Sequence, residues 1–204
     1  KAASGRLSRG VRGILAGGEP LFLVVGSLEP RKNLAFILDA FERAWEKNPD
    51  IRLVIVGHNT WKVAELLERI QQHPWIDRKL FWLRDASDTD LEYLYAKATA
   101  LVFASIIEGF GLPIVEAMQR GLPVLCSDIP VFREIADGKA IFFALETSDQ
   151  LVDAICQSAA ACGGGQVAAR RVYPWLSWRE STGMLLDRID SKFQFNRKGN
   201  ATCA

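Results

Sequence analysis

The sequence predicts an α/β fold: a doubly wound parallel sheet of about six strands, covered by helices on both faces. Short apolar runs alternate along the chain with longer segments in which apolar residues recur every three or four positions. This alternation is typical of strand–helix–strand units. The apolar runs are continuous rather than alternating with polar residues, which indicates strands buried on both faces, as in parallel sheets.

The first half of the chain supplies four strands and three helices. The clearest helix follows Asn33, because its apolar residues from Leu34 to Trp45 fall at the i, i+3, i+4, i+7 spacing and form one stripe. The predicted strands are 21–26, 53–57, 79–83 and 100–104, and the other predicted helices are 61–73 and 88–98.

The second half supplies two more strands, at 122–126 and 140–143, and helices at about 113–120, 130–137, 147–162 and 176–189. Residues 1–18 are basic and rich in small residues, so we expect a linker or arm there. Three successive glycines end the helix after residue 162. We therefore predict a main domain at 19–162, a C-terminal helical appendage at 163–190 and a flexible tail at 191–204.

The bulk composition excludes several classes of protein. A chain of 204 residues with 49% hydrophobic content suits one globular domain, and its net charge of +1 gives no electrostatic support for nucleic acid binding. No apolar run reaches the roughly 18–20 residues of a membrane span. Four cysteines without pairing or metal spacing predict reduced thiols in a cytoplasmic protein. Because the chain starts with Lys1, we expect a fragment of a longer protein.

The stretch from residue 105 to residue 128 has the most unusual local sequence. Glu108 and Glu116 bracket a glycine-rich turn that leads into a predicted helix starting at Pro113. Leu112 precedes that proline and cannot cap the helix, so the first amides of the helix are predicted to be uncapped and suited to binding an anion. The alternative is an ordinary strand-to-helix turn capped by water.

A second departure from local rules comes after the first strand. Arg31 and Lys32 start the following helix, where the helix dipole disfavours each cation by roughly 0.3–1 kcal/mol. In a doubly wound sheet this turn lies at the same edge as the turn around Glu108, so cations and bare amides would share one crevice. That arrangement would suit a diphosphate. The alternative is a solvated basic turn.

These segments resemble glycosyltransferase family four. The pattern Ser105-x-x-Glu108-Gly-Phe-Gly-Leu-Pro-x-x-Glu116-Ala-Met-x-x-Gly121-x-Pro-Val is similar to the family signature, and Val25-Gly-Ser-Leu-Glu-Pro-Arg-Lys-Asn33 is similar to its first phosphate-binding turn. The resemblance covers about residues 20–160. It implies the C-terminal, donor-binding Rossmann-like domain of a retaining enzyme with two such domains (the GT-B fold), and an N-terminal acceptor domain that is absent from this chain.

The resemblance also implies roles for individual residues. Glu108 would contact the donor sugar and stabilise charge at its anomeric carbon, while Arg31 and Lys32 would neutralise the diphosphate leaving group; these three are the predicted catalytic residues. Glu116 would bind the ribose hydroxyls. The remaining predicted substrate-binding residues are Phe110, Gly111 and Leu112 through their amides, Leu83 and Arg84 at the base, and Gly26, Ser27, Gly57 and His58 at the strand ends.

Two of these positions have open alternatives. Many family members carry an arginine where this chain has Ser27, and Arg31 is the candidate to replace it. His58 either lines the crevice or is simply a loop residue.

We expect no metal and no cofactor besides the nucleotide-sugar substrate. Asp88-Thr-Asp90 matches the Asp-x-Asp pattern of metal-dependent glycosyltransferases. However, Ser87 and Asp90 have the spacing of a capping box, and we favour that interpretation. The resemblance is also to enzymes that work without a metal.

The resulting hypothesis is the donor domain of a hexosyltransferase that uses a GDP- or UDP-linked sugar, inactive by itself. The Pro-Arg-Lys-Asn turn resembles that of mannosyltransferases of bacterial surface polysaccharide synthesis, which favours GDP-mannose and a full-length protein at the inner face of the membrane. Two alternatives are a sugar epimerase or phosphorylase of related fold and a non-catalytic nucleotide-binding module. The Glu108–Glu116 pair argues against the first, and the intact cations argue against the second.

Overall fold

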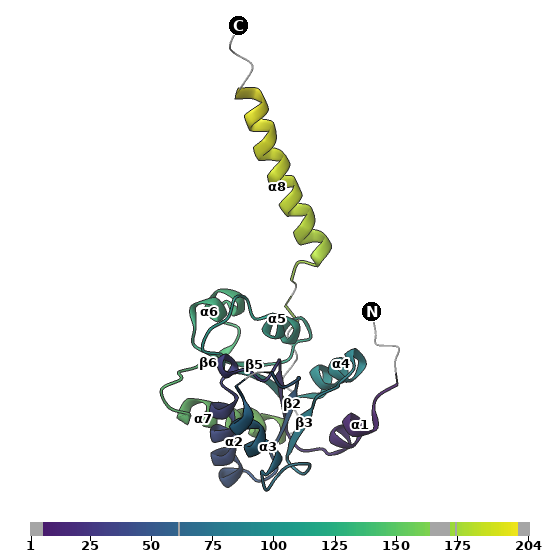
Figure 1. The fold of residues 1–204 in the computed structure, drawn as a ribbon, viewed down its shortest axis with the longest axis vertical. Coiled ribbons are helices and arrows are strands. Elements are labelled where there is room, and N and C mark those ends of the chain that lie inside the picture. Colours follow the sequence, from purple (N-terminus) through teal and green to yellow (C-terminus); the bar gives the residue numbers. More distant parts are fainter. Residues whose placement is uncertain (1–5, 61, 164–171, 174, 200–204) are drawn as a thin grey trace. The chain divides into compact units, whose positions relative to one another are not determined.

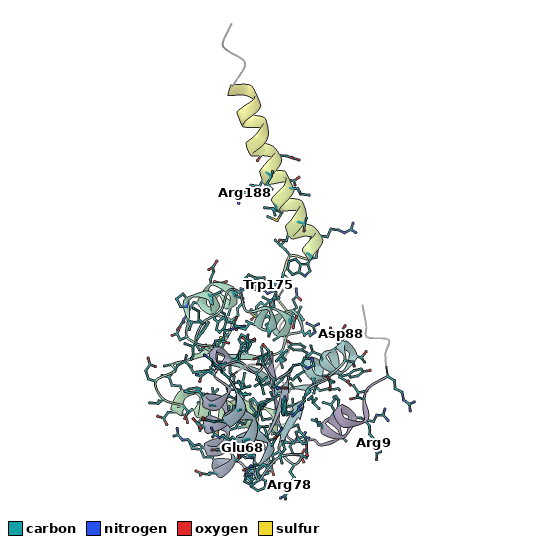
Figure 2. The ribbon with its side chains drawn as sticks, viewed as in Figure 1. Arg9, Glu68, Arg78, Asp88, Trp175 and Arg188 are labelled. Atoms are coloured by element: carbon teal, nitrogen blue, oxygen red, sulfur yellow. The ribbon has the colours of Figure 1, made fainter. Side chains whose placement is uncertain are left out.

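The structure is a computed structural model that describes residues 6–60, 62–163, 172–173 and 175–199. The chain divides into two units, Lys1–Tyr173 and Pro174–Ala204, and each is described by itself. In the first unit, Figure 2 shows side chains filling the space between sheet and helices, with labelled charged residues such as Glu68 and Arg78 on the surface.

A six-stranded parallel sheet forms the centre of the first unit, which confirms the predicted fold class (Figure 1). The strand order is β3-β2-β1-β4-β5-β6, so the direction of winding reverses between β1 and β4. Ligands of such sheets bind at the carboxyl ends of the strands beside this reversal. The strands are β1 (Leu21–Val25), β2 (Arg52–Val56), β3 (Leu80–Leu83), β4 (Ala100–Phe103), β5 (Val124–Ser127) and β6 (Ile141–Phe143).

Helices cover both faces of this sheet (Figure 1). One face carries α2 (Leu34–Lys47), α3 (Ala64–Gln71) and α7 (Asp149–Gly163), and α2 packs directly against α7. The other carries α4 (Asp88–Lys97), α5 (Leu112–Gln119) and α6 (Pro130–Ala136). The stripe predicted on α2 is confirmed, since all five of its apolar residues are buried: Leu34, Ile37, Leu38, Phe41 and Trp45.

The N-terminal segment contains a helix that the sequence analysis did not predict. Within residues 1–18, α1 (Arg9–Ala16) is capped by the Ser8 side chain and buries Val11 and Ile14. The Arg52 guanidinium holds the end of this helix, because Nη1 donates to the carbonyl of Ile14 at 2.6 Å. Val11, Ile14 and Leu15 do have helical spacing behind the Ser8 cap, but the basic, glycine-rich composition of the segment favoured the prediction of an arm.

The last helix also extends beyond its prediction. α8 (Trp178–Gly199) continues into the segment expected to be a flexible tail from residue 191. Ser177 and Glu180 form a capping box at the start of this helix, a pattern that is visible in the sequence. Ser177 Oγ accepts from the Glu180 amide at 3.2 Å, and Glu180 Oε2 accepts from the Ser177 amide at 2.7 Å. The glycine break at 163–165 and the predicted helix start at Trp61 fall partly or wholly outside the described residues, so the domain boundary at 163 stays a prediction.

Two glycines let adjacent strands end in close contact at the carboxyl edge. Gly26 follows β1 with φ 141° and Gly57 follows β2 with φ 152°. A Cβ atom on Gly57 would overlap the carbonyl oxygen of Gly26. The glycines therefore fix how the turn after β1, which carries Arg31 and Lys32, leaves the sheet.

The substitution Gly57→Ala should lower the free energy of unfolding by about 2–5 kcal/mol, because it combines a left-handed φ with a clash against backbone. Urea denaturation followed by circular dichroism measures this. The control is Gly13→Ala in α1, where a Cβ meets nothing within 4 Å. That change should leave stability unchanged or raise it by up to about 1 kcal/mol. Equal stability of the two variants would contradict the packing argument.

Candidate functional site

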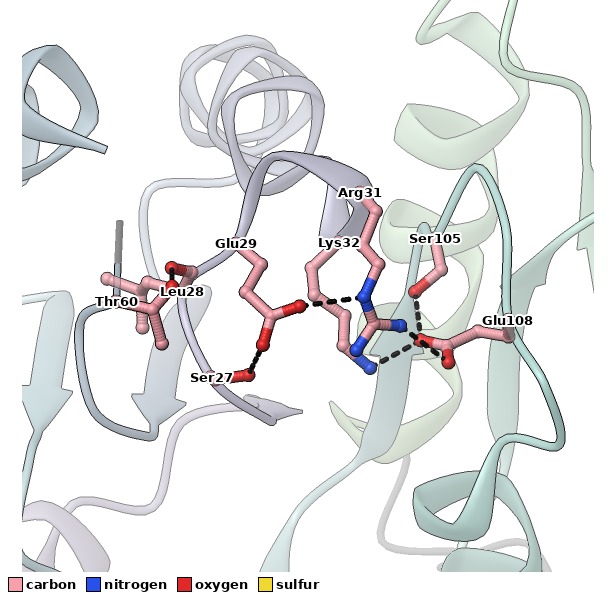
Figure 3. Close-up of polar contacts among 8 residues, drawn as sticks. All are labelled: Ser27, Leu28, Glu29, Arg31, Lys32, Thr60, Ser105 and Glu108. Carbon is pink, nitrogen blue, oxygen red and sulfur yellow. Dashed lines mark hydrogen bonds and ion pairs between the residues drawn. The ribbon is translucent and has the colours of Figure 1, made fainter. Parts of the chain in front are cut away.

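Three of the predicted site residues, Arg31, Lys32 and Glu108, meet where the sheet reverses its winding. The turn after β1 forms a short 3₁₀ helix, η1 (Pro30–Lys32), and the loop after β4 carries Glu108. A backbone hydrogen bond joins the two loops, since the amide of Ile106 donates to the carbonyl of Arg31 at 2.9 Å. Segments more than 70 residues apart in sequence are thus held side by side (Figure 3).

Glu108 is the centre of this site. Arg31 Nη1 donates to its Oε2 at 2.7 Å, and Lys32 Nζ and Ser105 Oγ both donate to its Oε1, the latter at 3.0 Å. Burial alone would raise the pKa of Glu108, but the bonds from Lys32, Ser105 and Arg31 outweigh it and lower the pKa below its ordinary value of 4.5. The carboxylate is therefore ionised at neutral pH and links two cations.

Arg31 is held from a second side by Glu29. Its Nε donates to Glu29 Oε2 at 2.7 Å, and the other carboxylate oxygen of Glu29 accepts from Ser27 Oγ (Figure 3). The bond from Ser27, and then Arg31, lower the pKa of Glu29 against the opposing effect of burial. A four-residue chain of polar contacts therefore runs from Ser27 to Glu108.

Aromatic rings connect the cations to the start of α5. The Lys32 ammonium lies 4.7 Å from the centroid of the Phe103 ring, and the Phe103 and Phe132 rings are 5.4 Å apart. Gly111 packs on Phe132, because a Cβ at Gly111 would be 2.9 Å from that ring. Lys32 and the start of α5 therefore pack against the same pair of aromatic rings.

The start of α5 is uncapped, but the predicted cap position was one residue too late. The N-cap is Gly111, with φ 99°, and Leu112 rather than Pro113 is the first helical residue. Gly111 has no side chain to cap with, so the predicted absence of a cap holds. Within the described residues, the amides of Phe110, Gly111 and Leu112 donate to no acceptor, which leaves them available to an anion.

Glu116 is fixed by α4, a contact that sequence reasoning missed. The buried Tyr95 donates its hydroxyl to Glu116 Oε2 at 2.7 Å, and Arg120, paired with Glu92, donates to the Glu116 carbonyl at 2.8 Å. Burial and the nearby Glu116 charge raise the pKa of Tyr95, so the phenol remains a donor. Nothing in the local sequence around Tyr95 signals this pairing. Ser105, by contrast, could have been found, since it lies in the motif three residues before Glu108.

The remaining predicted residues lie at the ends of β2 and β3. The His58 side chain is 72% exposed and lies 3.8 Å from Asp85, while its carbonyl accepts from the amide of Leu28 at 2.8 Å. The Arg84 guanidinium lies 4.0 Å from the centroid of the Trp82 ring. These residues share the carboxyl edge of the sheet with the Glu108 cluster, but no described hydrogen bond or ion pair joins them to it.

The Asp-x-Asp sequence caps a helix. Ser87 and Asp90 form the capping box of α4, as predicted, and Asp90 also accepts from the amide of Ser8 at 2.9 Å. In the described part of the chain, no three His, Cys, Asp or Glu side chains are grouped so that they could hold a metal ion. Among those same residues, no helix is both long enough and apolar enough to cross a membrane.

Residues 12–158 match the family described as glycosyl transferases group 1, and the match covers most of the chain. The chain belongs to this family. The resemblance noted in the sequence is thereby confirmed, and the region matched spans all six strands together with both carboxylates and both cations of the site.

Curated relatives of this group 1 domain include several mannosyltransferases. The chain is 42% identical over 170 residues to the serotype-specific mannosyltransferase WbdA of Escherichia coli, which covers 83% of this chain and 21% of WbdA. It is 34% identical over 148 residues to the O-antigen chain mannosyltransferase RfbU of Salmonella typhimurium, covering 67% and 40%. The chain therefore spans about a fifth of the length of WbdA.

Solved structures agree on the fold of this group 1 domain. The C-terminal domain of the group 1 protein LpcC from Francisella tularensis matches with a TM-score of 0.63 at 21% identity, over 82% of this chain and 87% of that domain. Anabaena Alr3699/HepE in complex with UDP and glucose matches with a TM-score of 0.62 at 20% identity, over 79% and 47%. The fold is that of the C-terminal domain of a GT-B protein, as predicted.

The substitution Glu108→Gln should destabilise this domain in a pH-dependent way. Because folding lowers the pKa of Glu108, its carboxylate stabilises the fold above the unfolded pKa of about 4.5, and this contribution is lost as the pH falls through the folded-state pKa. The stability difference between wild type and variant should thus be largest near pH 7 and shrink below about pH 4.

Urea denaturation at pH 7, 5 and 3.5 measures this difference. The control is Glu134→Gln, which removes an exposed carboxylate that forms no ion pair among the described residues. A difference between wild type and Glu108→Gln that stays constant over this pH range would show that the Glu108 charge is not what stabilises the cluster.

Proposed function

We propose that this chain is the donor-binding domain of a retaining glycosyltransferase that moves mannose from GDP-mannose to a glycan or lipid-linked acceptor in bacterial surface polysaccharide synthesis. The observation that carries the proposal is the joining of Arg31, Lys32 and Glu108 at the reversal of the sheet. The relatives named as mannosyltransferases support mannose as the sugar. An epimerase or phosphorylase of related fold and a non-catalytic nucleotide-binding module are the alternatives.

In this proposal the diphosphate binds between the cations and the start of α5. Arg31 and Lys32 supply two positive charges, and the uncapped amides of Gly111 and Leu112 supply donors at the positive end of the helix dipole. Negative charge grows on the diphosphate as its bond to the sugar breaks. Groups already in place for that charge lower the barrier without reorganising. With the donor bound, Glu108 would turn toward the sugar and stabilise positive charge at the anomeric carbon.

The nucleoside would extend from this point along the edge of the sheet. Tyr95 occupies one oxygen of Glu116, and the other accepts no hydrogen bond from the described residues, so it is available to ribose hydroxyls. The loop at Leu83 and Arg84 would hold the base. Gly26 and Gly57 would let the ligand approach the backbone, with Ser27 and His58 at the rim.

The proposed reaction needs a second domain and no metal. Since the chain spans about a fifth of WbdA, the acceptor wall of the cleft is assigned to a partner domain of a longer protein. We place that protein in the cytoplasm, at the inner face of the membrane. The cations of η1 take the place that a divalent ion would otherwise fill.

Calorimetry with GDP and UDP tests the assignment of the diphosphate and ribose contacts. Lys32→Ala and Glu116→Ala should each weaken binding of the preferred diphosphate at least tenfold, or about 1.4 kcal/mol, because each removes a charge-assisted contact. The matched control is Lys47→Ala at the far end of α2, which should bind like the wild type. Unchanged binding by Glu116→Ala would rule out the ribose role, and no binding by the wild type would favour a different function.

Transfer assays with GDP-mannose separate the binding role from catalysis. The 204-residue chain should bind the donor without transferring sugar, whereas a longer protein that includes it should transfer mannose with retained anomeric configuration, seen by NMR of the product. Lys32→Ala in that protein should lower kcat at least 100-fold, since leaving-group charge is then unmatched. Transfer by the isolated chain would contradict the assignment of the acceptor wall to another domain, and an epimerised free nucleotide sugar would support the first alternative.

A further inference from the structure

Arg31 and Lys32 are held in different ways, although they bind the same carboxylate. Lys32 is mostly buried, with 16% of its side chain exposed, and packs over the Phe103 ring. Arg31 has 41% of its side chain exposed, and no aromatic ring among the described residues supports its guanidinium. A half-exposed arginine loses rotamer entropy when it is ordered, so its orientation requires further contacts.

Glu29 supplies these contacts. It accepts from Arg31 Nε, while Glu108 accepts from Nη1, so two edges of the planar guanidinium are fixed at 2.7 Å each (Figure 3). Arg31 Nη2 has no acceptor among the described residues and remains for a ligand. Glu29 itself cannot rotate freely, because its second oxygen accepts from Ser27 and the next residue is Pro30, which starts η1.

The negative charge of Glu29 allows two possible roles to be distinguished by experiment. A carboxylate beside a diphosphate site repels the ligand, and solvent and salt weaken this repulsion without abolishing it. Simple electrostatics therefore predicts that neutralising Glu29 strengthens diphosphate binding. A carboxylate that orients a cation predicts the opposite.

We propose that Glu29, fixed by Ser27, is a positioning residue that orients the Arg31 guanidinium toward the diphosphate. Glu29 itself does not touch the ligand. The inference rests on the proposed function and adds to it the means by which a half-exposed cation is preorganised. If this is correct, removing the Glu29 charge should weaken binding of a nucleoside diphosphate more than binding of the monophosphate. The effect should also require Arg31.

Calorimetry on the 204-residue chain tests this with GDP and UDP, each compared with its monophosphate. Glu29→Gln should weaken the preferred diphosphate about three- to tenfold and the monophosphate less than twofold. In an Arg31→Ala background, adding Glu29→Gln should cause no further loss, because there is no guanidinium left to orient. The control is Glu65→Gln, which removes an exposed carboxylate lining the same 650 Å³ groove as Glu29, and should bind as tightly as the wild type or more tightly.

The outcomes separate the inference from the proposed function. Diphosphate binding by Glu29→Gln that equals or exceeds that of the wild type overturns the inference alone. A loss of equal size in the Arg31→Ala background does so too, since it would mean that Glu29 acts on the ligand or on the fold. If Glu29→Gln fails to fold, Ser27→Ala decides, with an expected loss in the same direction of about two- to threefold. Absence of wild-type binding to both diphosphates overturns the proposed function together with the inference.

Discussion

The contact of Glu108 with Arg31 and Lys32 is the interaction on which the site depends. Two cations about 5 Å apart repel each other by roughly 3 kcal/mol at an effective dielectric constant of about 20, so neither would stay beside the other without a shared anion. Glu108 supplies that anion from the loop after β4, and Ser105 holds it in place. The turn after β1 and the loop after β4 are therefore joined by charge as well as by the backbone bond from Ile106 to Arg31.

Backbone geometry makes this contact possible. Parallel strands β1 and β4 are neighbours, so their carboxyl ends open at the same edge, and the reversal of winding leaves the space between the two loops uncovered by a crossover helix. Gly26 and Gly57 let β1 and β2 end in close contact. The sheet thereby sets where the charged turn begins, and the side-chain contacts then set how its residues are oriented.

Local patterns determined most of the fold and part of the site. Buried parallel strands are continuously apolar and α2 carries a complete stripe, so both could be recognised in short windows of sequence. The helix α1 has Val11, Ile14 and Leu15 at helical spacing behind Ser8, which is a local signal, whereas its attachment by Arg52, far along the chain, could not be predicted from a short window. Arg31 and Lys32 broke a local rule and were found that way, whereas the roles predicted for Glu108 and Glu116 came from the family resemblance.

The contacts that orient those residues were harder to predict. Tyr95 and Glu116 are 21 residues apart and Arg31 and Glu108 are 77 apart, so each pair depends on how the sheet brings its loops together. Glu29 is close to Arg31 in sequence, yet a Glu-Pro-Arg turn alone does not say which acceptor the guanidinium faces. The sequence thus predicted candidate site residues, whereas the structure shows which of their atoms contact one another.

The charges of the cluster constrain how a diphosphate could bind. Arg31 and Lys32 are balanced by Glu29 and Glu108, so the four side chains together carry no net charge. On the proposed function, the diphosphate must therefore compete with Glu108 for the cations or draw on the amides at the start of α5. If Glu108 turns toward the sugar, the two cations lose a counterion at the moment the leaving group gains charge. Without a donor, Glu108 would then hold Arg31 and Lys32 together. With the donor bound, Glu108 would leave the two cations free to neutralise the diphosphate.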